Sequence, residues 1–197
     1  MSKVTVFGAG AWGSTMAQVL SDAGNEVLLW GRSESVIAEI TTAHTNVKYL
    51  GNHILPEAII ATTSLDDAFA FSQMYVLAIP AQEIRATLED WKDRFSSDCT
   101  IVSTLKGIEI TTQMRMTEVI EDVIGARKIA IITGPNLADE LVLRQPAGAV
   151  AAATSQVLAD QIRELFRTPY YRVYTSTDVM GCELAGAIKS VIALAVG

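Results

Sequence analysis

Near the start of the chain, glycines recur with the spacing G-x-G-x-x-G in the segment Gly8-Ala9-Gly10-Ala11-Trp12-Gly13. At this spacing Gly8 permits a tight turn, Gly10 lets the backbone approach a pyrophosphate, and Gly13 permits close packing between a helix and a strand. The N–H groups that open the following helix attract phosphate oxygens. The segment therefore predicts a dinucleotide-binding site, with a purely structural turn as the alternative.

Arg32 and Ser33 follow the second apolar run of the sequence. An NAD-specific site usually carries an acidic residue at this point, which binds the ribose 2′-hydroxyl. No acid stands here, and a guanidinium group can hold a 2′-phosphate or stack on adenine. We therefore expect NADP to be preferred over NAD, with an ordinary exposed arginine as the alternative.

Two lysines could carry charge or a proton in a reaction. Lys106 follows the apolar run 100–103, where an ammonium group could attract a phosphate or polarise a carbonyl, although an ordinary exposed lysine is the alternative. Lys189 shares a helical face with Ala185, Gly186, Ile192 and Ala193. A lysine in such a stripe extends to solvent, pairs with an acid, or gives up its proton easily. In the last case it would serve as a general acid or base.

A further candidate site follows the apolar run 129–133, in the segment Gly134-Pro135-Asn136-Leu137-Ala138-Asp139. Asn136 is predicted to be a helix N-cap, with Asp139 as the acid three residues later. This structural interpretation competes with a functional one, in which the start of the helix presents N–H groups to a bound substrate.

Apolar runs and helical patterns alternate along nearly the whole sequence. The predicted strands are residues 4–7, 26–30, 59–62, 74–79, 100–103, 129–133, 147–153 and 171–174. The predicted helices are residues 12–23, 34–42, 65–70, 82–94, 111–124, 137–142, 156–166 and 179–197. This order predicts an α/β fold with a doubly wound, mostly parallel, Rossmann-like sheet. Ligands of such sheets bind beyond the carboxyl ends of the strands, where the residues above are expected to lie.

The composition narrows the classes of protein that are possible. The chain has 197 residues, of which 50% are hydrophobic, so it can bury a sizeable core. Its net charge of −7 argues against general binding to nucleic acids or anionic membranes. The last apolar segment is interrupted by charges, so we expect no membrane insertion.

Cysteine, histidine and N-terminal residues favour a reducing, cytoplasmic location without a metal site. Met1-Ser2-Lys3 leads directly into the first predicted strand, which leaves no room for a signal peptide. Cys99 and Cys182 lack the spacing of a metal or redox site. His44 and His53 lie in a loop-like region and are expected to be ordinary surface residues.

The end of the sequence has no stop signal for its last helix. The apolar pattern runs as far as Gly197 without a polar cap or a closing element. We therefore expect the chain to be the front portion of a longer enzyme, with residues 1–177 as the dinucleotide-binding domain and 178–197 as the start of a second domain, which the resemblance described next implies is all-helical.

Five motifs together resemble NAD(P)-dependent glycerol-3-phosphate dehydrogenase of the bacterial type. They are GAGAWGS at 8–14, LWGR at 29–32, STLKGIE at 103–109, TGPNLADE at 133–140 and CELAGAIKSVIALAVG at 182–197. They cover the whole chain in the family's order. The resemblance implies reversible reduction of dihydroxyacetone phosphate, a small-molecule phosphate, to sn-glycerol 3-phosphate for phospholipid synthesis.

The resemblance also implies roles for single residues. The positions that match the family's cofactor contacts are Ala11, Trp12, Arg32, Lys106 and Ala138. The positions that match its substrate contacts are Lys106, Gly134, Asn136 and Lys189. The resemblance further implies that Lys189 is the catalytic proton carrier and that Lys106 assists it.

Two departures from the family pattern stand out. Ser190 occupies a position where many members have asparagine, and the helical second domain with its phosphate-binding residues is absent. We therefore expect the chain to hold NADP or NAD, to be inactive alone, and to form a homodimer, if at all, at full length. The alternatives are a dehydrogenase of 2-hydroxy or 3-hydroxy acids, and a non-catalytic dinucleotide-binding module.

Overall fold

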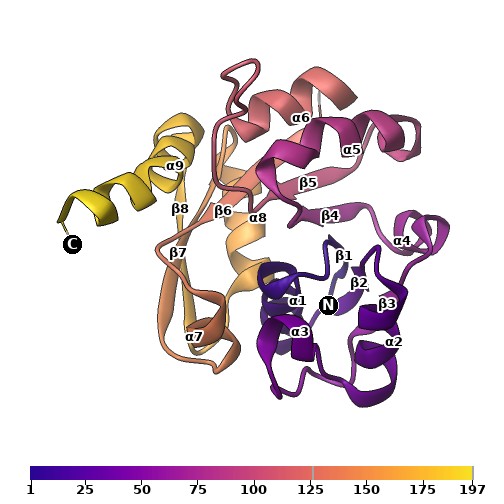
Figure 1. Ribbon diagram of the computed structural model, residues 1–197. Coiled ribbons are helices and arrows are strands. Elements are labelled where there is room, and N and C mark those ends of the chain that lie inside the picture. The colour runs from indigo at the N-terminus through magenta and orange to yellow at the C-terminus, as the bar shows by residue number, and fades with distance from the viewer. Residues whose placement is uncertain (126, 197) are drawn as a thin grey trace.

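An eight-stranded sheet forms the centre of the computed structural model, which describes residues 1–125 and 127–196, without the side chains of 190–193 (Figure 1). The strands are β1 (Lys3–Phe7), β2 (Glu26–Trp30), β3 (Ile60–Thr62), β4 (Met74–Leu77), β5 (Thr100–Ser103), β6 (Lys128–Thr133), β7 (Ala147–Ala153) and β8 (Tyr171–Ser176). Their order across the sheet is β3-β2-β1-β4-β5-β6-β7-β8. The pair β6–β7 is antiparallel and the other neighbouring pairs are parallel, so the mostly parallel sheet is confirmed.

Helices cover both faces of this sheet. They are α1 (Ala11–Asp22), α2 (Glu34–Ala43), α3 (Val47–Leu50), α4 (Leu65–Phe71), α5 (Ile84–Trp91), α6 (Met116–Ile124), α7 (Ala138–Val142), α8 (Gln156–Phe166) and α9 (Val179–Val196). Two 3-10 turns, η1 (Ala81–Glu83) and η2 (Lys92–Arg94), flank α5. Buried side chains of α1, α2 and α8 share one core, and those of α4, α5 and α6 share the other.

The alternation of side chains along each strand explains the two cores. Val4 and Val6 of β1 belong to the core beneath α1, whereas Phe7 belongs to the core beneath α5. Successive side chains of a strand point to opposite faces, so a strand covered on both faces must be apolar throughout. Phe7 packs with its ring centroid 5.0 Å from those of both Phe69 and Trp91. The central strands are therefore buried on both sides, as the doubly wound fold requires.

Most of the predicted elements are confirmed within two residues. The largest difference concerns the helix predicted over 111–124, because α6 begins only at Met116. The residues before it form a loop closed by a β-bridge between Ile108 and Arg115. The helix predicted over 82–94 is also divided into η1, α5 and η2, and the short helix α3 has no counterpart among the predictions.

His53 is not the ordinary surface residue that the sequence suggested. Its Nε2 lies 2.8 Å from Oε1 of Gln18, a fully buried residue of α1. Partial burial lowers the pKa of His53, and the positive charge of Arg144 lowers it further. His53 thus fastens the loop after α3 to the helix that carries the glycine turn.

The last helix, α9, packs against β6 and β7 and extends away from the sheet (Figure 1). It was predicted over 179–197 and is described over Val179–Val196. Gly197 and the side chains of Ser190, Ile192 and Ala193 lie outside the described residues, so the expectations about them stay predictions. No described helix has the length and apolarity that crossing a membrane would require.

Candidate active site

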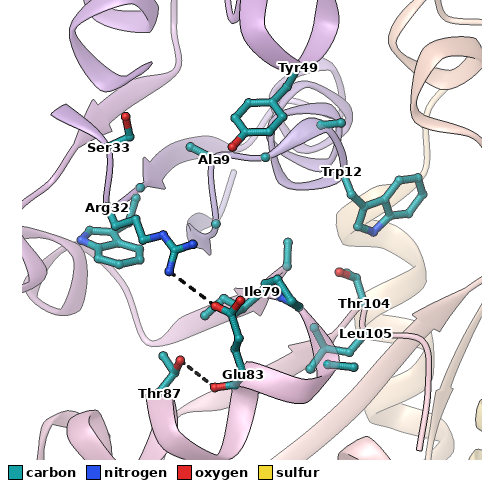
Figure 2. A pocket seen from close by; sticks show the side chains of 18 of the residues that line it. Ala9, Trp12, Arg32, Ser33, Tyr49, Ile79, Glu83, Thr87, Thr104 and Leu105 are labelled. Carbon is teal, nitrogen blue, oxygen red and sulfur yellow. Dashed lines mark hydrogen bonds and ion pairs between the residues drawn. The ribbon is translucent and has the colours of Figure 1, made fainter. Parts of the chain in front are cut away.

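A cavity of about 810 Å³ opens beyond the carboxyl ends of β1, β2, β4 and β5 (Figure 2). Most of its lining comes from four loops and α3: residues 8–12 after β1, 30–33 at the end of β2, 48–49 in α3, 78–81 after β4 and 104–106 after β5. Side chains of α2, η1 and α5 complete the lining, namely Val36, Glu83, Thr87, Asp90 and Trp91. Strand β1 lies between β2 and β4, so the chain order of the strands reverses beside it. The cavity thus occupies the position where doubly wound sheets bind their ligands.

Two glycines of the glycine turn are required by close packing. Gly8 has φ of +119°, and a Cβ atom there would lie 2.5 Å from the carbonyl oxygen of Ala78. A Cβ atom on Gly13 would lie 1.7 Å from the carbonyl oxygen of Gly8. Any larger residue at these two positions would force β1, β4 and α1 apart.

Gly10 differs from its two neighbours because packing does not explain it. A Cβ atom on Gly10 would meet nothing within 4 Å, and its φ of −79° is open to any residue. The space beside Gly10 belongs to the cavity wall. A glycine here leaves a cradle in which a ligand can approach the backbone, as a pyrophosphate does in dinucleotide sites.

The start of α1 provides hydrogen-bond donors at the same place. Gly10 is the N-cap residue and makes no side-chain capping bond. The N–H groups of the first helical turn have no partner inside the helix, and the helix dipole adds partial positive charge. Ala11 and Trp12 of this turn line the cavity. The geometry therefore fits an anionic group of a dinucleotide, and no described residue blocks it by capping the helix.

Arg32 and Ser33 lie at the rim of the cavity, where β2 ends. The Arg32 side chain is 81% exposed, and its Nη1 lies 3.4 Å from Oε2 of Glu83 in η1 (Figure 2). The sequence pointed to Arg32 but not to Glu83, which follows a different strand.

Helix α3 contributes Lys48 and Tyr49 to the cavity, and sequence reasoning missed both. Asn46, the residue before α3, is fully buried and donates from Nδ2 to the carbonyl oxygen of Ala9 at 3.0 Å and to Oγ of Ser14 at 2.9 Å. Asn46 therefore ties α3 to the glycine turn. A four-residue helix has no hydrophobic periodicity, so the only local signal was the polar Asn46 itself.

Lys106 enters the cavity from the loop after β5. Its Nζ donates to the carbonyl oxygen of Gly134 at 2.9 Å and lies 5.4 Å from the ring centroid of Trp12. Burial lowers the pKa of Lys106, and the positive charge of Lys189 lowers it further. Lys106 therefore connects the cavity to Gly134 and lies within electrostatic reach of Lys189.

Close packing of α9 on β6 places Lys189 near Lys106. A Cβ atom on Gly186 would lie 2.8 Å from Oγ1 of Thr133, the last residue of β6. Lys189 lies one helical turn after Gly186 and therefore on the same face of α9. The glycine lets α9 approach the strand that leads to Gly134, so Lys189 faces the site.

The acid nearest in sequence to Lys189 is engaged elsewhere. Glu183 is buried, and its carboxylate accepts hydrogen bonds from Arg115 Nη1 at 2.7 Å, Thr117 Oγ1 at 2.6 Å and Thr117 N at 2.9 Å. In the part of the chain that the structure describes, Lys189 has no carboxylate within ion-pair distance. The interpretation of Lys189 as one half of a structural lysine–carboxylate pair therefore finds no support there.

Asn136 does not cap the next helix, contrary to the sequence prediction. Helix α7 begins at Ala138, and its N-cap is Leu137. Asn136 is buried instead and donates from Nδ2 to Oη of Tyr171 in β8 at 3.2 Å, so its side chain is used by a distant strand rather than by the helix. Gly134, Asn136 and Ala138 lie outside the lining of the cavity, and Lys106 connects Gly134 to it.

The loop that carries Lys106 is fastened to η1 and α5 by the side chains of Gln82 and Arg85. Gln82 donates to the carbonyl oxygen of Ile108 at 2.9 Å and accepts from Ile110 N at 3.1 Å. Arg85 binds both carboxylate oxygens of the buried Glu109, with Nε–Oε1 at 2.9 Å and Nη2–Oε2 at 3.0 Å. The guanidinium holds the pKa of Glu109 below its usual range. This bidentate contact fixes the path of the chain just after Lys106.

We expect Arg85→Ala to lower the free energy of unfolding by about 2–3 kcal/mol, because it leaves the Glu109 carboxylate buried without its cation. Urea unfolding measures this loss, and hydrogen exchange should show faster opening of residues 104–115. The control is Arg94→Ala, whose partner Asp66 is 86% exposed. The exposed pair Arg94–Asp66 contributes at most about 1 kcal/mol to the free energy of unfolding. Equal losses in the two variants would therefore contradict the stabilising role given to the Arg85–Glu109 contact.

The sheet, the glycine turn and the cavity at the strand ends define an α/β domain of the doubly wound, dinucleotide-binding class. Residues 3–159 match the family described as NAD-dependent glycerol-3-phosphate dehydrogenase N-terminus, and the chain belongs to this family. The family predicted from the five sequence motifs is therefore confirmed.

Individual relatives agree with this family. The protein of Streptomyces coelicolor named glycerol-3-phosphate dehydrogenase (NAD(P)+) is 47% identical over 197 residues, which cover 99% of this chain and 59% of that protein. The solved structure of glycerol-3-phosphate dehydrogenase from Coxiella burnetii matches with a TM-score of 0.91 at 26% identity, over 98% of this chain and 59% of that one. The enzyme of Saccharomyces cerevisiae matches with a TM-score of 0.89 at 27% identity, over 98% and 61%. The chain therefore spans less than two thirds of the length of these relatives.

Proposed function

We propose that the chain binds NADP or NAD in the cavity beyond β1, β2, β4 and β5, as the cofactor-binding part of a glycerol-3-phosphate dehydrogenase. The observation that carries this proposal is the open cradle at Gly10, which stands beside the uncapped start of α1. Family membership and the names of the relatives, which include NAD(P)+, support it. The pyrophosphate would lie against Gly8, Gly10, Ala11 and Trp12, while Gly13 serves by letting α1 approach β1.

The remaining cofactor contacts follow from the rim of the cavity. Arg32 would face the ribose that carries the 2′ substituent, and its positive charge supports a preference for NADP. Lys106 would lie near the other end of the cofactor, against the Trp12 ring. Ala138 stands outside the cavity lining and stays a prediction.

We propose that the reaction is the reversible reduction of dihydroxyacetone phosphate to sn-glycerol 3-phosphate. A bound nicotinamide ring supplies the hydride for the carbonyl carbon in this direction and accepts it in the other. Lys189 donates a proton to the developing alkoxide and takes a proton back in the oxidation direction. Lys106 adds positive charge beside it, which stabilises the charge that develops on the oxygen.

The charges at the site support a phosphate as part of the substrate. Lys106 and Lys189 lie close enough for their charges to interact, and a second positive charge nearby favours an anion between them. Gly134 and Asn136 would form the floor of the substrate site. Asn136 is held by Tyr171, so its position is set before any substrate binds.

We further propose that residues 1–177 form the cofactor domain and that 178–197 belong to the helical substrate domain of the family. Exposed apolar side chains on α9 support a packing partner for this helix: Met180, Leu184 and Ile188 are 56%, 40% and 49% exposed. We also propose that the full-length enzyme forms a homodimer, that it is located in the cytoplasm, and that it serves phospholipid synthesis.

The test is a spectrophotometric assay of the full-length enzyme with NADPH and a panel of carbonyl substrates. We expect oxidation of NADPH that depends on dihydroxyacetone phosphate, and the reverse reaction with sn-glycerol 3-phosphate. Turnover with a 2-keto or 3-keto acid instead would replace the substrate assignment. Tight NADPH binding without turnover on any substrate would favour a non-catalytic binding module.

A further inference from the structure

Glu83 reaches across the rim of the cavity to Arg32. Its Oε2 lies 3.4 Å from Nη1 of Arg32, and Figure 2 shows the two side chains pointing toward each other from opposite walls. Arg32 follows β2, whereas Glu83 follows β4. The two residues meet because β1 separates these strands by a single position and both loops open into the same cavity.

Hydrogen bonds hold the main chain of Glu83, so the backbone position from which its side chain extends is fixed. Its N–H donates to the carbonyl oxygen of Pro80 at 2.9 Å, and its carbonyl accepts from Oγ1 of Thr87 at 2.8 Å. The side chain itself is half exposed, at 51%. It can therefore turn toward Arg32 or toward a ligand without disturbing η1 or α5.

Other charged residues also line the cavity, at different places. Lys48 and Lys106 are the remaining cations of the lining, and Asp90 is the remaining acid. Among the described residues, only Glu83 forms an ion pair with Arg32. The Glu83 carboxylate and the Arg32 guanidinium therefore lie together at the end of β2, where both can contact the same group of a ligand.

We propose that Glu83 sets the balance between NAD and NADP in this site, by supplying a carboxylate where residues 31–33, directly after β2, have none. This inference rests on the proposed function, because it assigns a role to a residue of the proposed cofactor site. With NAD, the ribose 2′-hydroxyl donates to the Glu83 carboxylate, and Arg32 remains paired. With NADP, the 2′-phosphate and Glu83 compete for the guanidinium, and their negative charges repel each other.

The size of the effect follows from the exposure of the pair. Both side chains are accessible to water, so screening keeps each interaction modest. Replacing the carboxylate by a neutral amide should therefore strengthen NADPH binding by about 3- to 10-fold, as expected for one charge facing a doubly charged phosphate in a partly exposed site. NADH binding should change by less than about twofold, because a glutamine oxygen still accepts from the 2′-hydroxyl.

The experiment compares dissociation constants of NADPH and NADH for the chain and for Glu83→Gln, by titration calorimetry at one fixed salt concentration. Glu89→Gln is the control, because it makes the same chemical change at an exposed residue of α5 that does not line the cavity. We expect the ratio of NADH to NADPH dissociation constants to rise in Glu83→Gln and to stay unchanged in Glu89→Gln. In an Arg32→Ala background the same change at Glu83 should have less effect on NADPH, because the contested guanidinium is gone.

An unchanged ratio in Glu83→Gln, with both nucleotides still bound, overturns this inference and leaves the proposed function intact. An equal rise in Glu89→Gln also overturns it, since the effect would then be a general consequence of lower negative charge. If the unsubstituted chain binds neither nucleotide, the proposed function fails together with the inference.

Discussion

Lys189→Met in the full-length enzyme is expected to lower kcat by about 10²- to 10⁴-fold, the range that a positioned proton donor contributes. The affinity for NADPH should stay within about twofold, because Lys189 lies on α9 and not in the lining of the cofactor cavity. Methionine keeps an unbranched side chain that is one atom shorter, and it removes the ammonium group with its proton and charge. Steady-state assays with dihydroxyacetone phosphate, together with NADPH titrations, separate the two effects.

Lys128→Met is the control for this prediction. Lys128 is an exposed lysine at the start of β6, at the opposite end of the strand that leads to Gly134. Its replacement should leave kcat unchanged. Near-normal turnover in Lys189→Met would remove Lys189 from the mechanism, and a large loss in both variants would point to a general effect of charge.

Gly10→Ala and Gly13→Ala are expected to fail in opposite ways, although they make the same chemical change three residues apart. In Gly13→Ala the new Cβ atom would lie 1.7 Å from the carbonyl oxygen of Gly8, so α1 must move away from β1. We expect a loss of about 3 kcal/mol or more in the free energy of unfolding. In Gly10→Ala the Cβ atom meets nothing, and we expect the stability to change by less than about 1 kcal/mol, because alanine is the poorer N-cap residue but restricts the unfolded chain.

For Gly10→Ala we expect a large loss of nucleotide affinity, in contrast to its small effect on stability. Its new methyl group would occupy the cradle that the pyrophosphate requires, so we expect NADPH affinity to fall by about 10-fold or more, which corresponds to about 1.4 kcal/mol. Urea unfolding and NADPH titration of both variants provide the comparison. Unchanged NADPH affinity in a stable Gly10→Ala variant would contradict the placement of the pyrophosphate.

The sequence was most informative where local rules and burial agree. Strands such as β4 are apolar on both faces because α1 and α5 cover them, and a run of apolar residues reports this directly. The glycine turn was equally readable, since the needs of Gly8 and Gly13 arise from backbone that lies close by in the chain or in the adjacent strand.

Prediction failed where a distant partner overrides a local preference. The start of the helix predicted at 111 is displaced to Met116, because Glu109 turns toward Arg85 and Thr112 hydrogen-bonds to that same carboxylate. Asn136 carries the signature of an N-cap, yet its amide is used by Tyr171, 35 residues later. Neither partner is visible in a short window of sequence.

The charge environment of the cavity was the least predictable feature. Residues 31–33, directly after β2, carry no acid, whereas Glu83 stands 51 residues from Arg32 and reaches it only through the strand order β2-β1-β4. Lys48 and Tyr49 enter through a four-residue helix fixed by Asn46. Such contacts depend on topology, which local patterns do not encode.

The central claim is that the cavity beside the glycine turn binds a nicotinamide dinucleotide, and the fluorescence of the chain reports on it directly. Its three tryptophans, Trp12, Trp30 and Trp91, all line this cavity. We predict that titration with NADPH quenches their emission saturably at one nucleotide per chain, with a dissociation constant below about 1 mM. Gly10→Ala should shift the curve to higher concentration. A linear, unsaturable response that is identical in the two proteins would contradict the account.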